Sequence, residues 1–126
     1  MTRYRYNQQI SPPAPFVHVT LQQAAGDEAI SDLTAQLETA ADLTVVPLRL
    51  IEELQLVPLD AVPVIGFGGI LVEVPTFLVR LTLRGEQPVT IKVLGSRDGP
   101  HILLGRDVLN QHRLVLDGPG LVLEVE

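Results

Sequence analysis

The sequence contains no cysteine among its 126 residues. A chain without cysteine has no disulfide framework, no thiolate zinc or iron–sulfur site and no thiol nucleophile. Positive charge is also scarce: 9 Lys and Arg stand against 15 Asp and Glu, the formal net charge is −6, and no basic run exists beyond Arg3 and Arg5. Nucleic-acid binding needs clustered cations that displace counterions, so we expect no nucleic-acid partner.

Long apolar runs are missing too. No run reaches the ~18 residues of a membrane span, and the polar residues 1–10 lack the apolar stretch of a secretory signal. We therefore expect a cytoplasmic protein with no membrane partner. The composition, 46% hydrophobic and 19% charged, is that of a folded chain, and its length suffices for one domain with a buried core.

Short strands account for most of the sequence. Residues 70–83 predict a long strand in which Pro75 marks an edge or a bend. Period-two alternation places one set of apolar side chains of this strand on a single face: Phe77, Val79, Leu81 and Leu83. Residues 22–32 are polar and predict a loop, whereas residues 33–38 and 43–46 predict short strands.

Helical patterns are few and short. Apolar residues at helical spacing predict a helix over 48–56, and a second helix of two turns is expected over 105–112. The sequence therefore predicts an all-β protein, a small closed barrel with one or two short helices. We expect residues 1–15 to be a loosely held N-terminal extension and residues 16–126 to be the domain.

A glycine-rich segment, Gly66-Phe67-Gly68-Gly69, predicts the tip of a β-hairpin, because glycine readily adopts positive φ. A phosphate-binding loop would open onto a helix, but the next residues predict a strand. The histidines and serines lack metal-ligand and catalytic-triad spacing: His18, His101, His112, Ser11, Ser31 and Ser96. We expect no metal and no organic cofactor.

Two further segments flank this hairpin: LETAADLTVVP at residues 37–47 and ILLGRDVL at residues 102–109. Their order resembles the retropepsin-like aspartic peptidases, which include retroviral proteases and bacterial relatives. In that family an apolar strand enters Asp-Thr-Gly-Ala-Asp, a flap hairpin with a glycine tip follows, and an apolar-apolar-Gly-Arg motif opens a short helix. The resemblance covers residues 16–117 and implies an acid-protease-type barrel.

The resemblance implies an aspartic endopeptidase that works as a homodimer. Each subunit of the family supplies one carboxyl to a dyad whose two groups, ~3 Å apart, share a proton and activate water. Here Glu38 stands in place of the catalytic aspartate and Ala40 in place of the glycine. A longer side chain displaces the carboxyl by roughly 1 Å, which costs about 10²-fold in rate. We expect little or no peptidase activity.

The resemblance also implies roles for neighbouring residues. Glu38, Thr39 and Ala40 form the catalytic segment, in which Thr39 braces the two loops across the twofold axis and the Cβ of Ala40 disfavours any positive φ. An extended peptide or protein substrate would contact a further set: Ala41, Asp42, Gly66, Phe67, Gly68 and Gly69. Gly105 and Arg106 are structural.

Two contacts are predicted on this basis. We expect Asp42 and Arg106 to form a partly buried ion pair, whose loss by Arg106→Ala would be costly. The apolar run Leu121–Val125 is a candidate for strand pairing with a second copy, because an unpaired apolar edge favours association.

Two other interpretations stay open. The same fold could serve as a non-catalytic peptide-binding or dimerisation module. Alternatively, Glu38 is an ordinary residue at a strand end and the resemblance is accidental.

Overall fold

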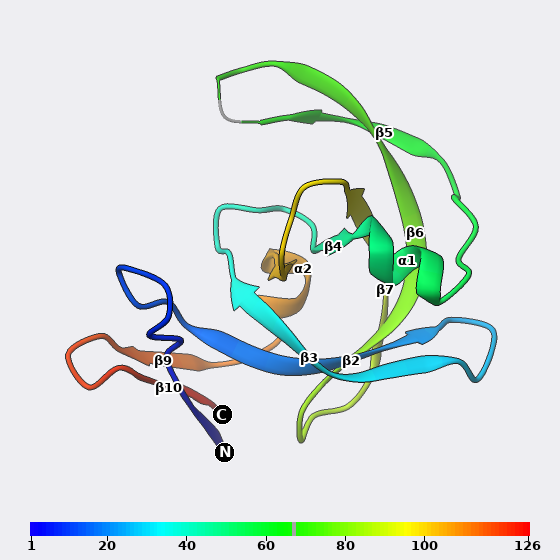
Figure 1. The fold of residues 1–126 in the computed structure, drawn as a ribbon. Helices are drawn as coiled ribbons and strands as arrows, with labels where there is room; N and C mark the ends of the chain where they lie inside the picture. Colours follow the sequence, from blue (N-terminus) through cyan, green and yellow to red (C-terminus); the bar gives the residue numbers. More distant parts are fainter. Residues whose placement is uncertain (67) are drawn as a thin grey trace.

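The computed structural model describes residues 1–66 and 68–126, which form ten strands and two short helices (Figure 1). Six strands close a barrel in the order β2-β3-β8-β4-β7-β6, because β6 pairs back with β2. The prediction of an all-β closed barrel with short helices is confirmed. The barrel strands are β2 (Phe16–Gln23), β3 (Ala29–Leu37), β4 (Val45–Pro47), β6 (Leu71–Leu83), β7 (Val89–Ser96) and β8 (Ile102–Leu104).

The core fills the inside of this barrel. Alternate residues of β2 and β6 point inward, and this set is at most 4% exposed: Val17, Val19, Leu21, Phe77, Val79, Leu81 and Leu83. Burial of each such side chain contributes about 1.5–3 kcal/mol. Leu104 of β8, which precedes the Gly-Arg motif, is fully buried among them.

Both helices are shorter than predicted. Helix α1 (Leu48–Glu53) ends early because Gln55 adopts a positive φ of 55°, a conformation that terminates helices. Helix α2 (Arg106–Leu109) starts after Gly105, whose backbone is extended, and is capped by Asn110. Apolar spacing continues past the end of α1 to Leu54, which is why the sequence predicted a longer first helix, whereas the residues after α2, Asn110, Gln111 and His112, are polar.

The predicted loop over residues 22–32 is wrong. Strand β3 begins at Ala29 and pairs with β2 as far as Gln22↔Ala29. A shift of register between Val19 and Leu21 accompanies a positive φ of 59° at Asp32, which identifies a β-bulge. The polar side chains of this hairpin lie on its solvent face, so their polarity did not reveal the strand.

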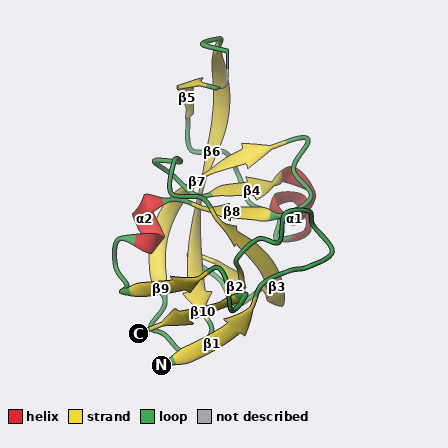
Figure 2. Cartoon of the chain, turned by 90° about the vertical axis from the view of Figure 1, so that its left-hand side faces the viewer, coloured by secondary structure: helices red, strands yellow, loops and turns green. Residues whose placement is uncertain are grey.

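The chain termini form a separate three-stranded sheet, β1 (Thr2–Arg5), β10 (Val122–Val125) and β9 (Leu114–Asp117), at the base of the molecule (Figure 2). Tyr4 of β1 is buried, so the expectation of a loosely held N-terminus is wrong here. β10 lies between β1 and β9, and Leu123 is fully buried. The expected free edge at Leu121–Val125 is therefore wrong: both edges of β10 are paired within the chain.

A long hairpin of β5 (Ala61–Ile65) and the first part of β6 projects from the barrel (Figures 1 and 2). β6 pairs with β5 as far as Pro75 and with β7 from Thr76 onward, so the bend predicted at Pro75 is where the strand leaves the barrel. Gly68 and Gly69 have φ of 93° and 76° at the tip, as expected for a tight turn. Phe67 lies outside the described residues.

Candidate active site

The loop 38–44 connects β3 to β4 and carries the predicted catalytic segment. The N–H of Glu38 donates to the carbonyl of Leu104 at 2.9 Å, which extends the parallel pairing of β3 with β8. The N–H of Ala41 donates to the carbonyl of Glu38 at 3.2 Å and closes a tight turn. The loop therefore has a defined shape in a single chain.

The carboxylate of Glu38 folds back onto its own loop. Its Oε1 accepts the N–H of Ala40 at 3.2 Å, and the side chain is half-buried. Among the described residues, positive φ occurs outside glycine only at Asp32, Gln55 and Leu121. Ala40 is therefore unstrained, and its methyl group lies on an exposed residue rather than in a forbidden conformation.

Arg106, at the start of α2, ties this loop to the helix. Its Nη1 donates to the carbonyl of Thr39 at 2.7 Å, its N–H donates to the carbonyl of Ala41 at 2.9 Å, and its Nη2 pairs with Asp42. The predicted ion pair is confirmed. The two side chains are 43% and 85% exposed, so the expected burial is wrong and the charges face water.

A buried threonine and a carboxylate complete the anchorage, and neither was predicted from the sequence. The Thr44 hydroxyl donates to Asp107 Oδ1 at 2.8 Å, and the Thr44 N–H donates to Oδ2 at 3.0 Å. Thr44 Oγ1 also accepts the N–H of Gly105 at 3.1 Å. A threonine between apolar neighbours and an acidic residue in the first turn of a helix were the available signals.

Glycine is required at position 105 because the backbone of the loop 38–44 lies very close to it, and not because of an unusual backbone conformation. Its φ is −86°, but a Cβ at this position would lie 2.6 Å from the carbonyl carbon of Leu43 and 3.0 Å from the carbonyl oxygen of Ala41. Only glycine lets α2 start against the loop, which explains why Gly precedes Arg in this motif.

A cavity of about 450 Å³ lies beneath the hairpin, between it, β4 and the end of β7. Val45, which directly follows the loop 38–44, forms one wall. The remaining lining is mostly apolar, and its two charged side chains are Glu73 and Arg97. The other lining residues are Leu48, Val64, Val72, Val74, Pro75, Leu94, Gly95 and Ser96. The cavity is suited to an apolar side chain of an extended ligand.

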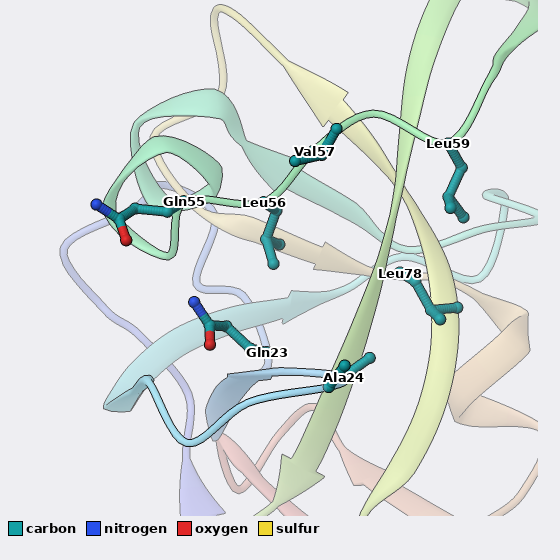
Figure 3. Close-up of a pocket in the computed structure, with 8 residues that line it drawn as sticks. Gln23, Ala24, Gln55, Leu56, Val57, Leu59 and Leu78 are labelled. Carbon is teal, nitrogen blue, oxygen red and sulfur yellow. The ribbon is translucent and has the colours of Figure 1, made fainter.

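A second hollow, of about 280 Å³, lies between α1 and the β2–β3 turn (Figure 3). Leu56, Val57, Leu59 and Leu78 supply apolar side chains around it, and no titratable residue lines it. It therefore offers no acid–base chemistry. No metal-binding group of three or more His, Asp or Glu occurs within residues 1–66 and 68–126. Across the same residues, no helix has the length and apolar character needed to span a membrane.

No family model and no curated protein matches the sequence. Solved structures do match: EIAV protease complexed with the inhibitor HBY-793 aligns with a TM-score of 0.63 and 24% identity, over 86% of this chain and 93% of the viral one. The retroviral protease-like domain of Ddi1 from Leishmania major aligns with a TM-score of 0.50 and 14% identity, over 88% of each chain. The chain has the fold of the retropepsin-like aspartic peptidases.

On this retropepsin-like fold, the structure brings together Glu38, Thr39, Ala40, Ala41 and Asp42 with the start of α2. The glycine tip of the hairpin lies apart from this cluster, above it in Figure 1 and toward the same side of the molecule. The chain therefore shares the fold of these protease domains.

Proposed function

We propose that the chain is a retropepsin-type endopeptidase domain that binds an extended peptide as a homodimer, with an impaired carboxyl dyad. A single chain supplies one carboxyl, Glu38, so a second copy must supply the other. The observation that carries the proposal is the intact anchorage of the loop: Thr44, Asp107 and Arg106 hold it as a catalytic loop would need to be held.

The β5–β6 hairpin is proposed to act as the flap. A peptide beneath it would add main-chain hydrogen bonds in the manner of strand addition. Ile65, Ile70 and Leu71 of the hairpin are between 63% and 70% exposed, so the chain alone leaves apolar surface near the tip uncovered. A bound peptide or the flap of a second copy would cover it.

The impairment follows from the position of the Glu38 carboxylate. The extra methylene of Glu38 moves the carboxyl by roughly 1 Å from where an aspartate would hold it, whereas the reaction needs two carboxyls close enough to share a proton. The exposed methyl group of Ala40 stands where the two loops would approach each other.

The test is hydrolysis of a denatured protein substrate between about pH 3 and 7, the range over which carboxyl acid–base catalysis operates. We expect little or no cleavage by the unaltered chain and recovery by the double variant Glu38→Asp with Ala40→Gly. The matched control is Glu38→Asn with Ala40→Gly, which keeps the shorter side chain but has no carboxyl. Robust cleavage by the unaltered chain would contradict the impairment, and an inert double variant would contradict the peptidase assignment.

The second candidate is a peptide-binding module without turnover. It is favoured by the hairpin and its apolar cavity, which are complete although the carboxyl is altered. In that case Glu38→Gln leaves peptide affinity unchanged, and the double variant binds without cleaving.

A further inference from the structure

The flap hairpin is attached to the barrel at a cluster of polar groups around Asp60. This residue directly precedes β5 and lies opposite Thr76 of β6. The N–H of Thr76 donates to the Asp60 carbonyl at 2.8 Å, and the N–H of Leu59 donates to the Thr76 carbonyl at 2.9 Å. The Thr76 hydroxyl, on a fully buried residue, donates to the Asp60 carboxylate. Both backbone and side chains therefore join the two strands here.

A third strand reaches the same carboxylate. Lys92 Nζ of β7 donates to Asp60 Oδ2 at 2.9 Å. Lys92 is the charged residue of β7, β5 has none, and the charges of β6 are Glu73 and Arg80. The hydrogen bond from Thr76 and then that from Lys92 lower the pKa of Asp60 below the usual aspartate value. The charged carboxylate is therefore the form that joins β5, β6 and β7.

The same point of the barrel holds the Glu38 loop. Thr76 faces Leu94 across β6 and β7, and the N–H of Leu94 donates to the Thr44 carbonyl at 2.9 Å. Thr44 and Thr76 are the two fully buried polar residues among those described. Each has its hydroxyl on an aspartate, Asp107 and Asp60 respectively. The base of the flap and the Glu38 loop are thus fixed to one position of β7.

We propose that Asp60 is a positioning residue that sets the flap over the Glu38 loop by clamping the base of the hairpin to Thr76 and Lys92. The proposal rests on the proposed function, because it takes the hairpin to be the flap of that site. Up to Pro75 the hairpin strand β6 pairs with β5 alone. The hairpin is therefore joined to the barrel sheet at its base, and a clamp at that base sets the direction of its whole length.

The clamp has a defined response to pH. A lowered pKa means that the charged carboxylate stabilises the folded arrangement at pH values above the ordinary aspartate value. That contribution is lost as pH falls through the lower folded-state pKa. The flap therefore stays clamped through mild acid and loosens only below the usual range of aspartate.

The absence of cysteine allows a direct test. Gly66→Cys at the hairpin and Gly118→Cys in the β9–β10 turn both place the new side chain in open space, without positive φ. Spin labels on both, in chains diluted with unlabelled protein, report the distance from flap to base within one protomer. We expect one narrow distance distribution at neutral pH and at mildly acidic pH. Asp60→Ala should broaden it, and the exposed Asp27→Ala in the β2–β3 turn should not.

Two more variants separate the clamp from a general loss of stability. Lys92→Gln should broaden the distribution and Lys92→Arg, which keeps the cation, should restore it. Asp60→Asn, which preserves size, should broaden it and remove any change at strongly acidic pH. Circular dichroism confirms that each variant is folded. An unchanged distribution in folded Asp60→Ala or Asp60→Asn would overturn the proposal.

This measurement needs no turnover. A broader distance distribution for Asp60→Ala in a chain without peptidase activity supports the clamp even where the peptidase assignment fails. If Asp60→Ala leaves the distance distribution unchanged in a double variant that cleaves peptides, the clamp alone is overturned.

Discussion

At Glu38 and at Gly105, the size of one side chain affects the loop 38–44 in opposite ways. The Glu38 carboxylate accepts the Ala40 N–H, so this longer side chain binds the loop that presents it. At Gly105 the reverse holds, because any side chain would collide with the backbone of Leu43. One position tolerates a longer residue in the isolated chain, and the other tolerates none.

Gly105→Ala should therefore destabilise the fold. The new Cβ would lie 2.6 Å from the Leu43 carbonyl carbon, and overpacking of this kind costs about 1–3 kcal/mol. Each kcal/mol lowers Tm by about 2–8 °C in a domain of this size. Thermal unfolding checks this, with Gly118→Ala as the control because its Cβ would meet open space. Equal Tm values for the two variants would contradict the close approach.

The two anchors of the loop should differ in strength. Asp107→Ala leaves the buried Thr44 hydroxyl and N–H without their acceptors, which costs about 1–3 kcal/mol. Arg106→Ala removes an exposed ion pair, and such pairs contribute less than about 1 kcal/mol. Chemical denaturation should rank Asp107→Ala as the more damaging change, with Asp98→Ala, at an exposed position between β7 and β8, as control. The opposite ranking would show that Arg106 is the main anchor.

At the scale of elements, the terminal sheet supports the barrel from below. Tyr4 of β1 stacks on His18 of β2 with ring centroids 6.0 Å apart and an interplanar angle of 18°. Tyr4 is buried on the inner face of the sheet, next to Leu123 of β10 in the strand register. The first strand of the chain therefore belongs to the hydrophobic core.

The phenol of Tyr4 should ionise at a higher pH than an ordinary tyrosine. Burial raises its pKa above the ordinary tyrosine value of 10.0. A raised pKa means that this group stabilises the fold below pH ~10 and that the contribution is lost as pH rises through the folded-state pKa. The chain has two tyrosines, so Tyr6→Phe leaves Tyr4 as the sole chromophore for an absorbance titration. A midpoint at the ordinary value would mean that β1 separates from the sheet.

Sequence patterns predicted the elements that depend on local order. Alternation located the inward face of β6, and three glycines in four residues located the hairpin tip. The pairing of β1 with β10 was not predictable in this way, because polar Arg3 and Arg5 alternate with the buried Tyr4 and obscure the strand. The Thr44–Asp107 contact joins residues far apart in sequence, and no local pattern reports such contacts.

At the scale of the whole molecule, the terminal sheet is complete within one chain. A homodimer therefore does not require β10 as an open edge. The surfaces open to the proposed partner include the exposed loop residues Thr39 and Ala40, the hairpin, and the outer edges of β1 and β9. A dimer built on the loop and the hairpin alone should be weak, because stable interfaces bury on the order of 1,200–2,000 Å².

Sedimentation velocity from micromolar concentration upward should show a monomer–dimer equilibrium. Ala40→Gly should raise the dimer fraction, because it removes the methyl group from the surface where two loops would meet. Ala25→Gly, at an exposed position of the β2–β3 turn, is the control and should change nothing. A strict monomer for the chain and for Ala40→Gly would contradict the shared-site arrangement.

The closure of the barrel by β6 has a consequence for folding. Its pairs with β2, from Val19↔Leu83 to Gln23↔Val79, and the pairs of β3 with β8 join segments that are distant along the chain, whereas the β2–β3, β5–β6 and β6–β7 hairpins are local. Local pairs form early and distant ones late, so we expect the ring to close after its hairpins have formed. The β5–β6 hairpin lies outside this ring. Its amides should therefore exchange with solvent through local openings, while those of the ring exchange only when the whole domain unfolds.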